Sequence, residues 1–222
     1  MNNISRNISL IRQQIPPSVK LVAVSKTKPV SDIMEAYGAG QRLFGENRAG
    51  ELLMKKDQLP PDIEWHMIGH LQTNKARSIV SCISLIHSAD SFRLIKTIDS
   101  EAMKAGLVIN CLLQFHIASE ETKSGFLMKE VAEMLDSPEF WSLKSVRICG
   151  VMGMATFTDD KVRVRSEFRY LAGCYKTLKE KYFSKEQAFR EISMGMSDDF
   201  RIAIEEGSTM IRIGSLIFGE RK

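Results

Sequence analysis

The residue best suited to covalent chemistry is a lysine at the end of a short apolar segment, Val22-Ala-Val-Ser-Lys26. Burial of a lysine disfavours its ammonium form and lowers its pKa. The neutral amine is the form that attacks an aldehyde to give an imine. The other interpretation is a lysine whose charged end reaches solvent at the mouth of the fold. This segment alone does not decide between the two.

Two segments near the end of the sequence combine small residues with hydroxyl groups, Ser193–Ser197 and Gly207–Gly219. Ser197 places a hydroxyl where a helix would begin, and Gly214 and Ser215 place backbone amides before the next helix. Unpaired amides at the N-terminus of a helix form a ready anion site. We therefore favour a phosphate site over the alternative, which is close packing of small residues with ordinary helix capping.

Other polar side chains also belong to apolar segments. Arg212 lies between Ile211 and Ile213, and a buried guanidinium needs an acceptor, either a carboxylate of the protein or a ligand atom such as a pyridine nitrogen. Asn47 ends another segment. His66 and His70 are four residues apart, but on a strand they lack the helical spacing of a zinc pair and no third ligand is evident. No metal site is therefore expected.

Short β-rich stretches alternate with helical ones and would position these side chains. The eight expected strands are Leu21–Lys26, Arg42–Asn47, Glu64–Gly69, Leu85–Asp90, Asn110–His116, Ser145–Gly153, Glu191–Gly195 and Met210–Gly214. Strands separated by helices imply parallel crossovers, and eight such units in 222 residues favour a closed (β/α)8 TIM barrel over an open sheet. The chain is interpreted as one domain, residues 1–222, with an extra helix at Ile4–Gln14 that covers the bottom or edge of the barrel.

The composition excludes other classes of protein. A net charge of +4, with basic residues spread along the chain, is too weak a signal for nucleic-acid binding, and the cluster Lys161–Arg165 is expected to be a solvated helix face. No apolar run approaches the roughly 20 residues that span a membrane, and the N-terminal segment lacks the core of a signal peptide. Four scattered cysteines fit a reduced protein of the cytoplasm.

Several segments together resemble the pyridoxal phosphate homeostasis proteins, also called the proline synthase co-transcribed family. The matching segments are Val22–Pro29, Phe44–Asn47, Trp65–Lys75, Lys123–Phe126, Gly150–Met152, Ser193–Asp198 and Gly207–Gly219. The resemblance implies a barrel like the N-terminal domain of alanine racemase, with pyridoxal 5'-phosphate held on Lys26 as an internal aldimine. It also implies a role in vitamin B6 homeostasis and in amino-acid and keto-acid balance.

The resemblance assigns roles to the other candidates. The expected cofactor-binding residues are Lys26, Asn47, His66, Ser197, Arg212, Gly214 and Ser215. Among them Ser197, Gly214 and Ser215 would hold the phosphate, Arg212 would contact the pyridine nitrogen, and Asn47 would lie near the ring.

The main competing hypothesis is an amino-acid racemase or decarboxylase that depends on pyridoxal phosphate and has weak activity. Racemisation needs a base on each face of the substrate. The racemases of this fold take the second base from a C-terminal domain, and this chain ends eight residues after Gly214. A charged Arg212 also disfavours a proton on the pyridine nitrogen, which makes the electron sink shallow. We therefore expect a monomeric carrier that could deliver the cofactor to apo-enzymes, rather than an enzyme. A plain scaffold for protein partners is a third possibility.

Overall fold

The computed structural model describes residues 3–119 and 124–220, and its centre is a closed barrel of eight parallel strands. The strands are β1 Lys20–Val24, β2 Leu43–Glu46, β3 Glu64–Met67, β4 Leu85–Ala89, β5 Ile109–Gln114, β6 Val146–Met152, β7 Glu191–Ser193 and β8 Met210–Ile213. Each pairs with the next in the chain, and β8 pairs with β1 to close the ring. The predicted barrel and its eight strands are confirmed.

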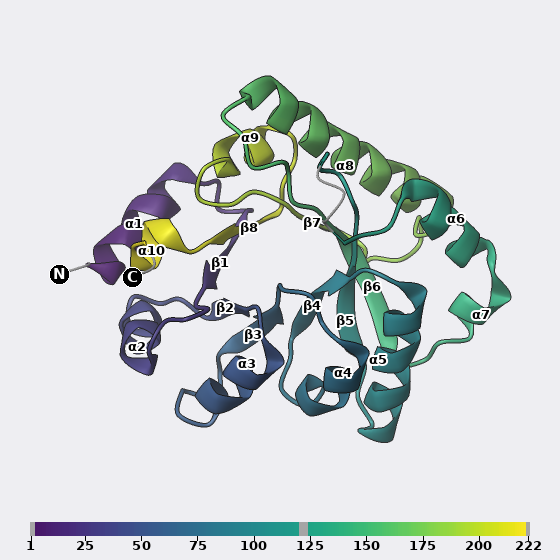
Figure 1. Ribbon diagram of the computed structural model, residues 1–222, viewed down its shortest axis with the longest axis horizontal. Coiled ribbons are helices and arrows are strands. Elements are labelled where there is room, and N and C mark those ends of the chain that lie inside the picture. The colour runs from purple at the N-terminus through teal and green to yellow at the C-terminus, as the bar shows by residue number, and fades with distance from the viewer. Residues whose placement is uncertain (1–2, 120–123, 221–222) are drawn as a thin grey trace.

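Helices surround the barrel on its outer side (Figure 1). They are α1 Ile4–Gln14, α2 Val30–Gly38, α3 Ala49–Lys56, α4 Thr73–Ile79, α5 Phe92–Lys104, α6 Met128–Asp136, α7 Pro138–Trp141, α8 Lys161–Lys181, α9 Phe200–Glu205 and α10 Ser215–Phe218. Helix α5 begins after Ser91, whose hydroxyl caps the helix by accepting a hydrogen bond from the amide of Leu94 at 3.3 Å. It ends before Gly106, whose positive φ of 67° suits glycine.

The N-terminal helix α1 packs along the edge of the barrel and does not cover its bottom. Its apolar residues Ile4, Ile8 and Ile11 recur at helical spacing and are buried. They pack against α2 and α10, which places α1 between the first and last helices of the ring (Figure 1). Asn7 fixes this position by donating a hydrogen bond to the carbonyl of Ile217 at 2.9 Å.

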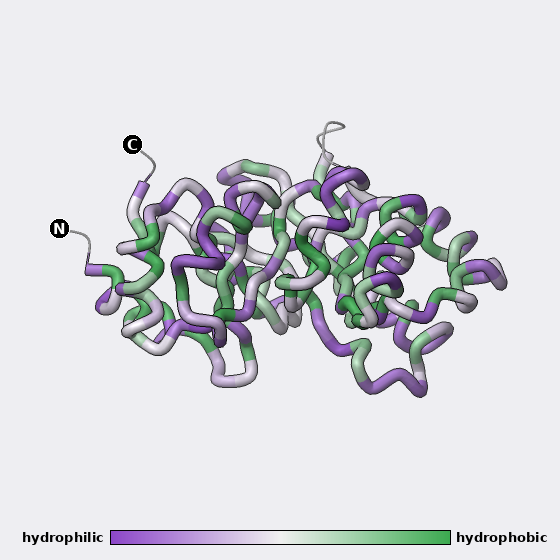
Figure 2. Tube along the Cα trace, turned by 90° about the horizontal axis from the view of Figure 1, so that it is seen from below, coloured by the Kyte–Doolittle hydropathy of each residue, from purple (hydrophilic) through white to green (hydrophobic). Residues whose placement is uncertain are grey.

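Alternation along the strands sorts side chains between two apolar cores. On β8, Ile211 and Ile213 belong to the core between the barrel and the helices, whereas Met210 belongs to a smaller cluster inside the barrel. Val22 and Leu112 belong to the same inner cluster. Figure 2 shows hydrophobic (green) and hydrophilic (purple) stretches following one another along the chain. The inner cluster lies between the N-terminal mouth of the barrel, where the strands begin, and the C-terminal mouth, where they end.

The structure locates the cysteines and the basic cluster. All four cysteines are free thiols. Arg165 of the basic cluster pairs with Glu205, the last residue of α9, and with Glu206, which follows it. Arg169 also pairs with Glu206, so α8 uses these charges within the protein. Within the described ranges, no helix has both the length and the apolar character that a membrane crossing requires.

Candidate cofactor site

A cavity of about 210 Å³ opens at the C-terminal mouth, beside the ends of β1, β7 and β8. Its lining residues are Val24, Lys26, Lys28, Phe157, Met196, Ser197, Asp198, Arg212, Gly214, Ser215 and Gly219. Five of the seven predicted site residues are therefore brought together, although they come from opposite ends of the chain. This location is the usual one for the functional site of a parallel α/β barrel.

The other two predicted site residues lie elsewhere. Asn47 directly follows β2 at the same mouth, half-buried, with its backbone so close to Gly69 that a Cβ on that glycine would lie 2.5 Å from the Asn47 carbonyl oxygen. His66 is buried inside the barrel and lines a different cavity at the N-terminal mouth. Neither residue lines the cavity that contains Lys26, and their contact with a cofactor stays a prediction.

A buried ion network beneath the Lys26 segment was not foreseen from the sequence. The amine of Lys55 on α3 donates hydrogen bonds to the carbonyl of Ser25 at 2.8 Å, to Glu46 at 2.8 Å and to Glu51 at 2.6 Å. The Ser25 hydroxyl also donates to Glu46 at 2.6 Å. Burial raises the pKa of Glu46, and the hydrogen bonds from Lys55 and Ser25 oppose that rise. The network fixes the backbone of the residue that precedes Lys26.

The residue that follows Lys26 is held by the same network. Thr27 has a φ of 65°, the one positive φ at a non-glycine position in the described chain. Its amide donates to Glu51 at 2.5 Å, and Glu51 is in turn bound by Lys55. A left-handed threonine persists only where its surroundings fix it. The turn that directs Lys26 into the cavity is therefore fixed on both sides.

Hydrogen-bond donors gather around the other half of the cavity. The loop after β7 contains Ser197, and Gly214 precedes the short helix α10, which begins at Ser215. Throughout residues 3–119 and 124–220, no group accepts a hydrogen bond from the backbone amides of Ser197, Ser215 or Leu216. Amides that lack an acceptor beside serine hydroxyls form the donor set that an anionic oxygen requires.

Arg212 points into the barrel with an exposure of 4%. Its guanidinium donates to the Ser193 hydroxyl at 2.6 Å and to the carbonyl of Gly153 at 3.0 Å. Burial lowers the pKa of Arg212 to about 10, against the opposing charge of Asp199, so the group is still a cation at neutral pH. In the described chain it has no carboxylate within hydrogen-bond distance. A ligand acceptor in the cavity would therefore be a favourable further partner.

Two buried histidines extend the hydrogen bonds of Arg212 through the barrel. Ser193 Oγ lies 2.9 Å from His87 Nδ1, and His87 Nε2 lies 3.0 Å from His66 Nδ1. Arginine can only donate, so Ser193 accepts from Arg212 and has its own proton for His87. We therefore assign both histidines as neutral Nε2–H tautomers, with every donor directed from Arg212 towards His66.

These tautomers predict a specific NMR result. Burial, with Lys20 as a second cause, lowers the pKa of His66 to about 3, and burial lowers that of His87 well below its ordinary value. Long-range ¹H–¹⁵N spectra should show both rings neutral and protonated at Nε2 from pH 8 down to pH 5. The unfolded chain binds these protons below about pH 6.5, whereas the folded protein does not. The free energy of unfolding should therefore decrease as the pH falls from about 6.5 towards 3. Titration of His66 near pH 6.5 would contradict the assignment.

Comparison with known proteins identifies the family. The model of the family described as alanine racemase, N-terminal domain, matches residues 1–222. Two relatives are named pyridoxal phosphate homeostasis protein. The one from Synechocystis sp. is 40% identical to this chain over 212 residues, and the one from Escherichia coli (strain K12) is 35% identical over 235 residues. These matches cover 93% and 100% of this chain, and 94% and 98% of the relatives. The chain belongs to the pyridoxal phosphate homeostasis protein family.

Solved structures agree with this assignment. PipY of Synechococcus elongatus PCC7942, solved without PLP, has a TM-score of 0.91 at 37% identity, and the match covers 97% of this chain and 100% of PipY. PipY with PLP bound has a TM-score of 0.88 at 36% identity, with the same coverage. Alanine racemase of Clostridium difficile 630 has a TM-score of 0.79 at 15% identity, covering 99% of this chain and 57% of the racemase. That likeness shows the fold alone.

Proposed function

We propose that this family member binds pyridoxal 5'-phosphate at the C-terminal mouth, in a Schiff base with Lys26, and serves vitamin B6 homeostasis as a carrier. The observation that carries the proposal is the single cavity shared by Lys26 on the β1 side and by the serine loops after β7 and β8. The PLP-bound structure of PipY supports it. Free thiols suit a reducing compartment, so we place this role in the cytoplasm. We also infer that the protein is a monomer and that it affects amino-acid and keto-acid balance.

The donor set of the cavity fits this cofactor. Ser197, Gly214 and Ser215 would hold the phosphate, because hydroxyls and amides without an acceptor surround that part of the cavity. Arg212 would donate to the pyridine nitrogen, and Asn47 would lie near the ring from the neighbouring strand end. When bound, pyridoxal phosphate supplies an aldehyde for the amine and an electron sink for amino-acid chemistry.

The residues around the cavity favour a carrier over an enzyme. Arg212 is a buried cation at neutral pH, and its charge disfavours a proton on an adjacent pyridine nitrogen. The four tyrosines could otherwise supply a second base. They lie on or beside the outer helices α2 and α8, and none lines the cavity. We infer that the protein holds the cofactor in a form of low reactivity and passes it to apo-enzymes.

A phosphate contact by Ser215 predicts a loss that depends on the phosphate. Ser215→Ala should weaken binding of pyridoxal phosphate by about tenfold, the value of a hydrogen bond to a charged group. Pyridoxal, which lacks the phosphate, should bind the variant and the wild type equally. Ser78→Ala, on the exposed face of α4, is the control. Equal losses for both ligands would place the hydroxyl away from the phosphate.

One experiment separates the carrier from the enzyme. Protein loaded with pyridoxal phosphate is incubated with L-alanine and other amino acids, and the D-isomers and decarboxylation products are measured. In parallel, loaded protein is mixed with an apo-enzyme that needs the cofactor, and recovery of that enzyme's activity is followed. We expect recovery in the second assay without turnover in the first. Turnover that Lys26→Ala removes would establish the enzyme hypothesis instead.

A further inference from the structure

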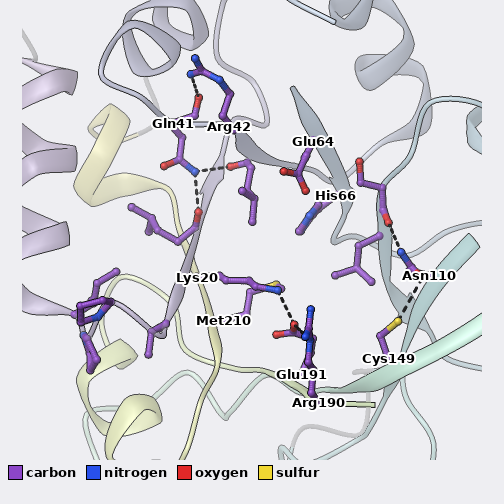
Figure 3. Close-up of a pocket in the computed structure, with 18 of the residues that line it drawn as sticks. Lys20, Gln41, Arg42, Glu64, His66, Asn110, Cys149, Arg190, Glu191 and Met210 are labelled. Carbon is purple, nitrogen blue, oxygen red and sulfur yellow. Dashed lines mark hydrogen bonds and ion pairs between the residues drawn. The ribbon is translucent and has the colours of Figure 1, made fainter. Parts of the chain in front are cut away.

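The larger cavity of the barrel lies at its other end. It has a volume of about 900 Å³, and each of the eight strands contributes at least one lining residue from its beginning (Figure 3). The loop after α1, with Pro16 and Pro17, forms one side, because α1 itself packs along the edge of the barrel. The N-terminal mouth is therefore open, and the site proposed for the cofactor lies beyond the inner apolar cluster.

The charges around this cavity favour an anion. The cationic lining residues are Arg12, Lys20, Arg42, Arg147 and Arg190, and the carboxylates are Glu64 and Glu191. Lys20 and Glu191 pair with each other at 2.6 Å, as Figure 3 shows. Arg147 is exposed and has no ion-pair partner in the described part of the chain. Arg42 pairs with Asp62 at 2.8 Å, and Arg190 lies 3.6 Å from Glu191, so Arg147 is the cation of this lining that we assign to a ligand.

The interior surface of the cavity is partly apolar. Leu43, Leu85 and Met210 line it at the level where the strands begin, and Met210 and Leu85 belong to the inner apolar cluster. The side-chain amide of Asn110 lies at the edge of the cavity and donates to the carbonyl of Ser84 at 3.4 Å. Such a surface suits a ligand with an apolar body as well as a charged group.

His66 adds a directed hydrogen-bond donor. In the tautomers that we assign, its Nδ1 accepts from His87 and its Nε2–H is the donor, and the ring borders the cavity in Figure 3. In the described structure Nε2 has no protein partner, yet it is not among the buried polar atoms that lack one, so it retains access to the cavity. The chain of donors that starts at Arg212 therefore ends at a position that requires an acceptor.

We propose that the N-terminal mouth is a second binding site, for a small organic anion that carries a carboxylate or phosphate on an apolar body. The anion accepts the Nε2–H of His66 and pairs with Arg147, while its apolar part lies against Leu43, Leu85 and Met210. Through His66, His87 and Ser193 the bound anion is hydrogen-bonded to Arg212 in the cofactor cavity. The site itself does not depend on the proposed role of Lys26.

Phenyl phosphate is a suitable probe because it joins a dianion to an apolar ring. We would titrate it into ¹⁵N-labelled protein loaded with pyridoxal phosphate and follow the His66 imidazole and the amides of Asn110 and Ser215. The expected result is a saturable shift of His66 and Asn110 with no shift of Ser215. Phenol, which lacks the charge, should leave all three signals unchanged.

Variants make this test specific. Arg147→Ala should weaken the probe about three- to fivefold, as the loss of one partly solvated ion pair predicts. Arg77→Ala removes the same side chain from the exposed surface of α4, outside both cavities, and should have no effect. Unshifted His66 signals, or equal losses in the two variants, would overturn the proposal. Lys26→Ala should bind the probe at His66 as the wild type does. The result at His66 therefore tests the second site even if Lys26 forms no Schiff base.

Discussion

Lys26→Ala is expected to abolish the absorption band of the Schiff base while leaving the fold intact. The Lys26 side chain is half-buried and follows β1 into the cavity, so its removal deletes the one amine to which we assign the covalent bond. The phosphate loops are untouched, and the variant should therefore bind pyridoxal phosphate weakly and without the band. The measurement is an absorption titration of both proteins with the cofactor.

The same cavity offers a matched control. Lys28 also lines it, but its amine donates to the carbonyls of Phe218 and Gly219 at 3.2 and 3.3 Å. Lys28→Ala should therefore keep the band, with a change only in affinity. A band that survives Lys26→Ala and disappears in Lys28→Ala would move the covalent bond to the second lysine.

Lys55→Met is expected to lower the free energy of unfolding by about 3–5 kcal/mol, the usual result of removing one partner from a buried ion pair. Glu46 is fully buried, and its Oε2 atom already lacks a hydrogen-bond partner. Without Lys55 its carboxylate would be buried without a counter-charge. The segment from Ser25 to Thr27 would also lose its anchor, so the variant should form the Schiff base less completely at the same cofactor concentration.

Neighbouring positions provide the controls for this prediction. Lys56→Met, one residue later, removes a lysine that pairs with the exposed Asp57, and should change stability by no more than about 0.5 kcal/mol. Combining Lys55→Met with Glu46→Gln removes both charges and should recover much of the loss. Urea unfolding measures all four proteins. Equal effects of the two lysine variants would show that the buried network contributes little.

The fold was readable from the sequence because each unit repeats the same local pattern. All eight strands were predicted, with their C-terminal ends placed one or two residues too late. The segment expected to end at Lys26, for example, ends as β1 at Val24, and the one expected to end at Gly214 ends as β8 at Ile213. Lys26 and Gly214 lie beyond the paired part of the sheet and line the cavity. A sequence pattern that includes them therefore overestimates the length of the strand.

The connections across the barrel could not be read in this way. His87 lies in a strand that reads as apolar, and its partner Ser193 is 106 positions away in the sequence. Lys55 looks like an ordinary helix-surface lysine until α3 packs over Glu46. Both contacts depend on which strand residues face into the barrel and which face the surrounding helices, and the sequence pattern predicts this only locally. The same holds for His66, whose sequence neighbours gave no sign that it lines the N-terminal mouth.

The Schiff base with Lys26 is tested most directly by locating the cofactor after reduction. Protein loaded with pyridoxal phosphate is treated with borohydride, digested and analysed by mass spectrometry. We expect the reduced cofactor on the peptide that contains Lys26, and on no other lysine in stoichiometric amount. Cofactor that is lost on unfolding after reduction, or that is spread over surface lysines, would contradict a Schiff base at this position.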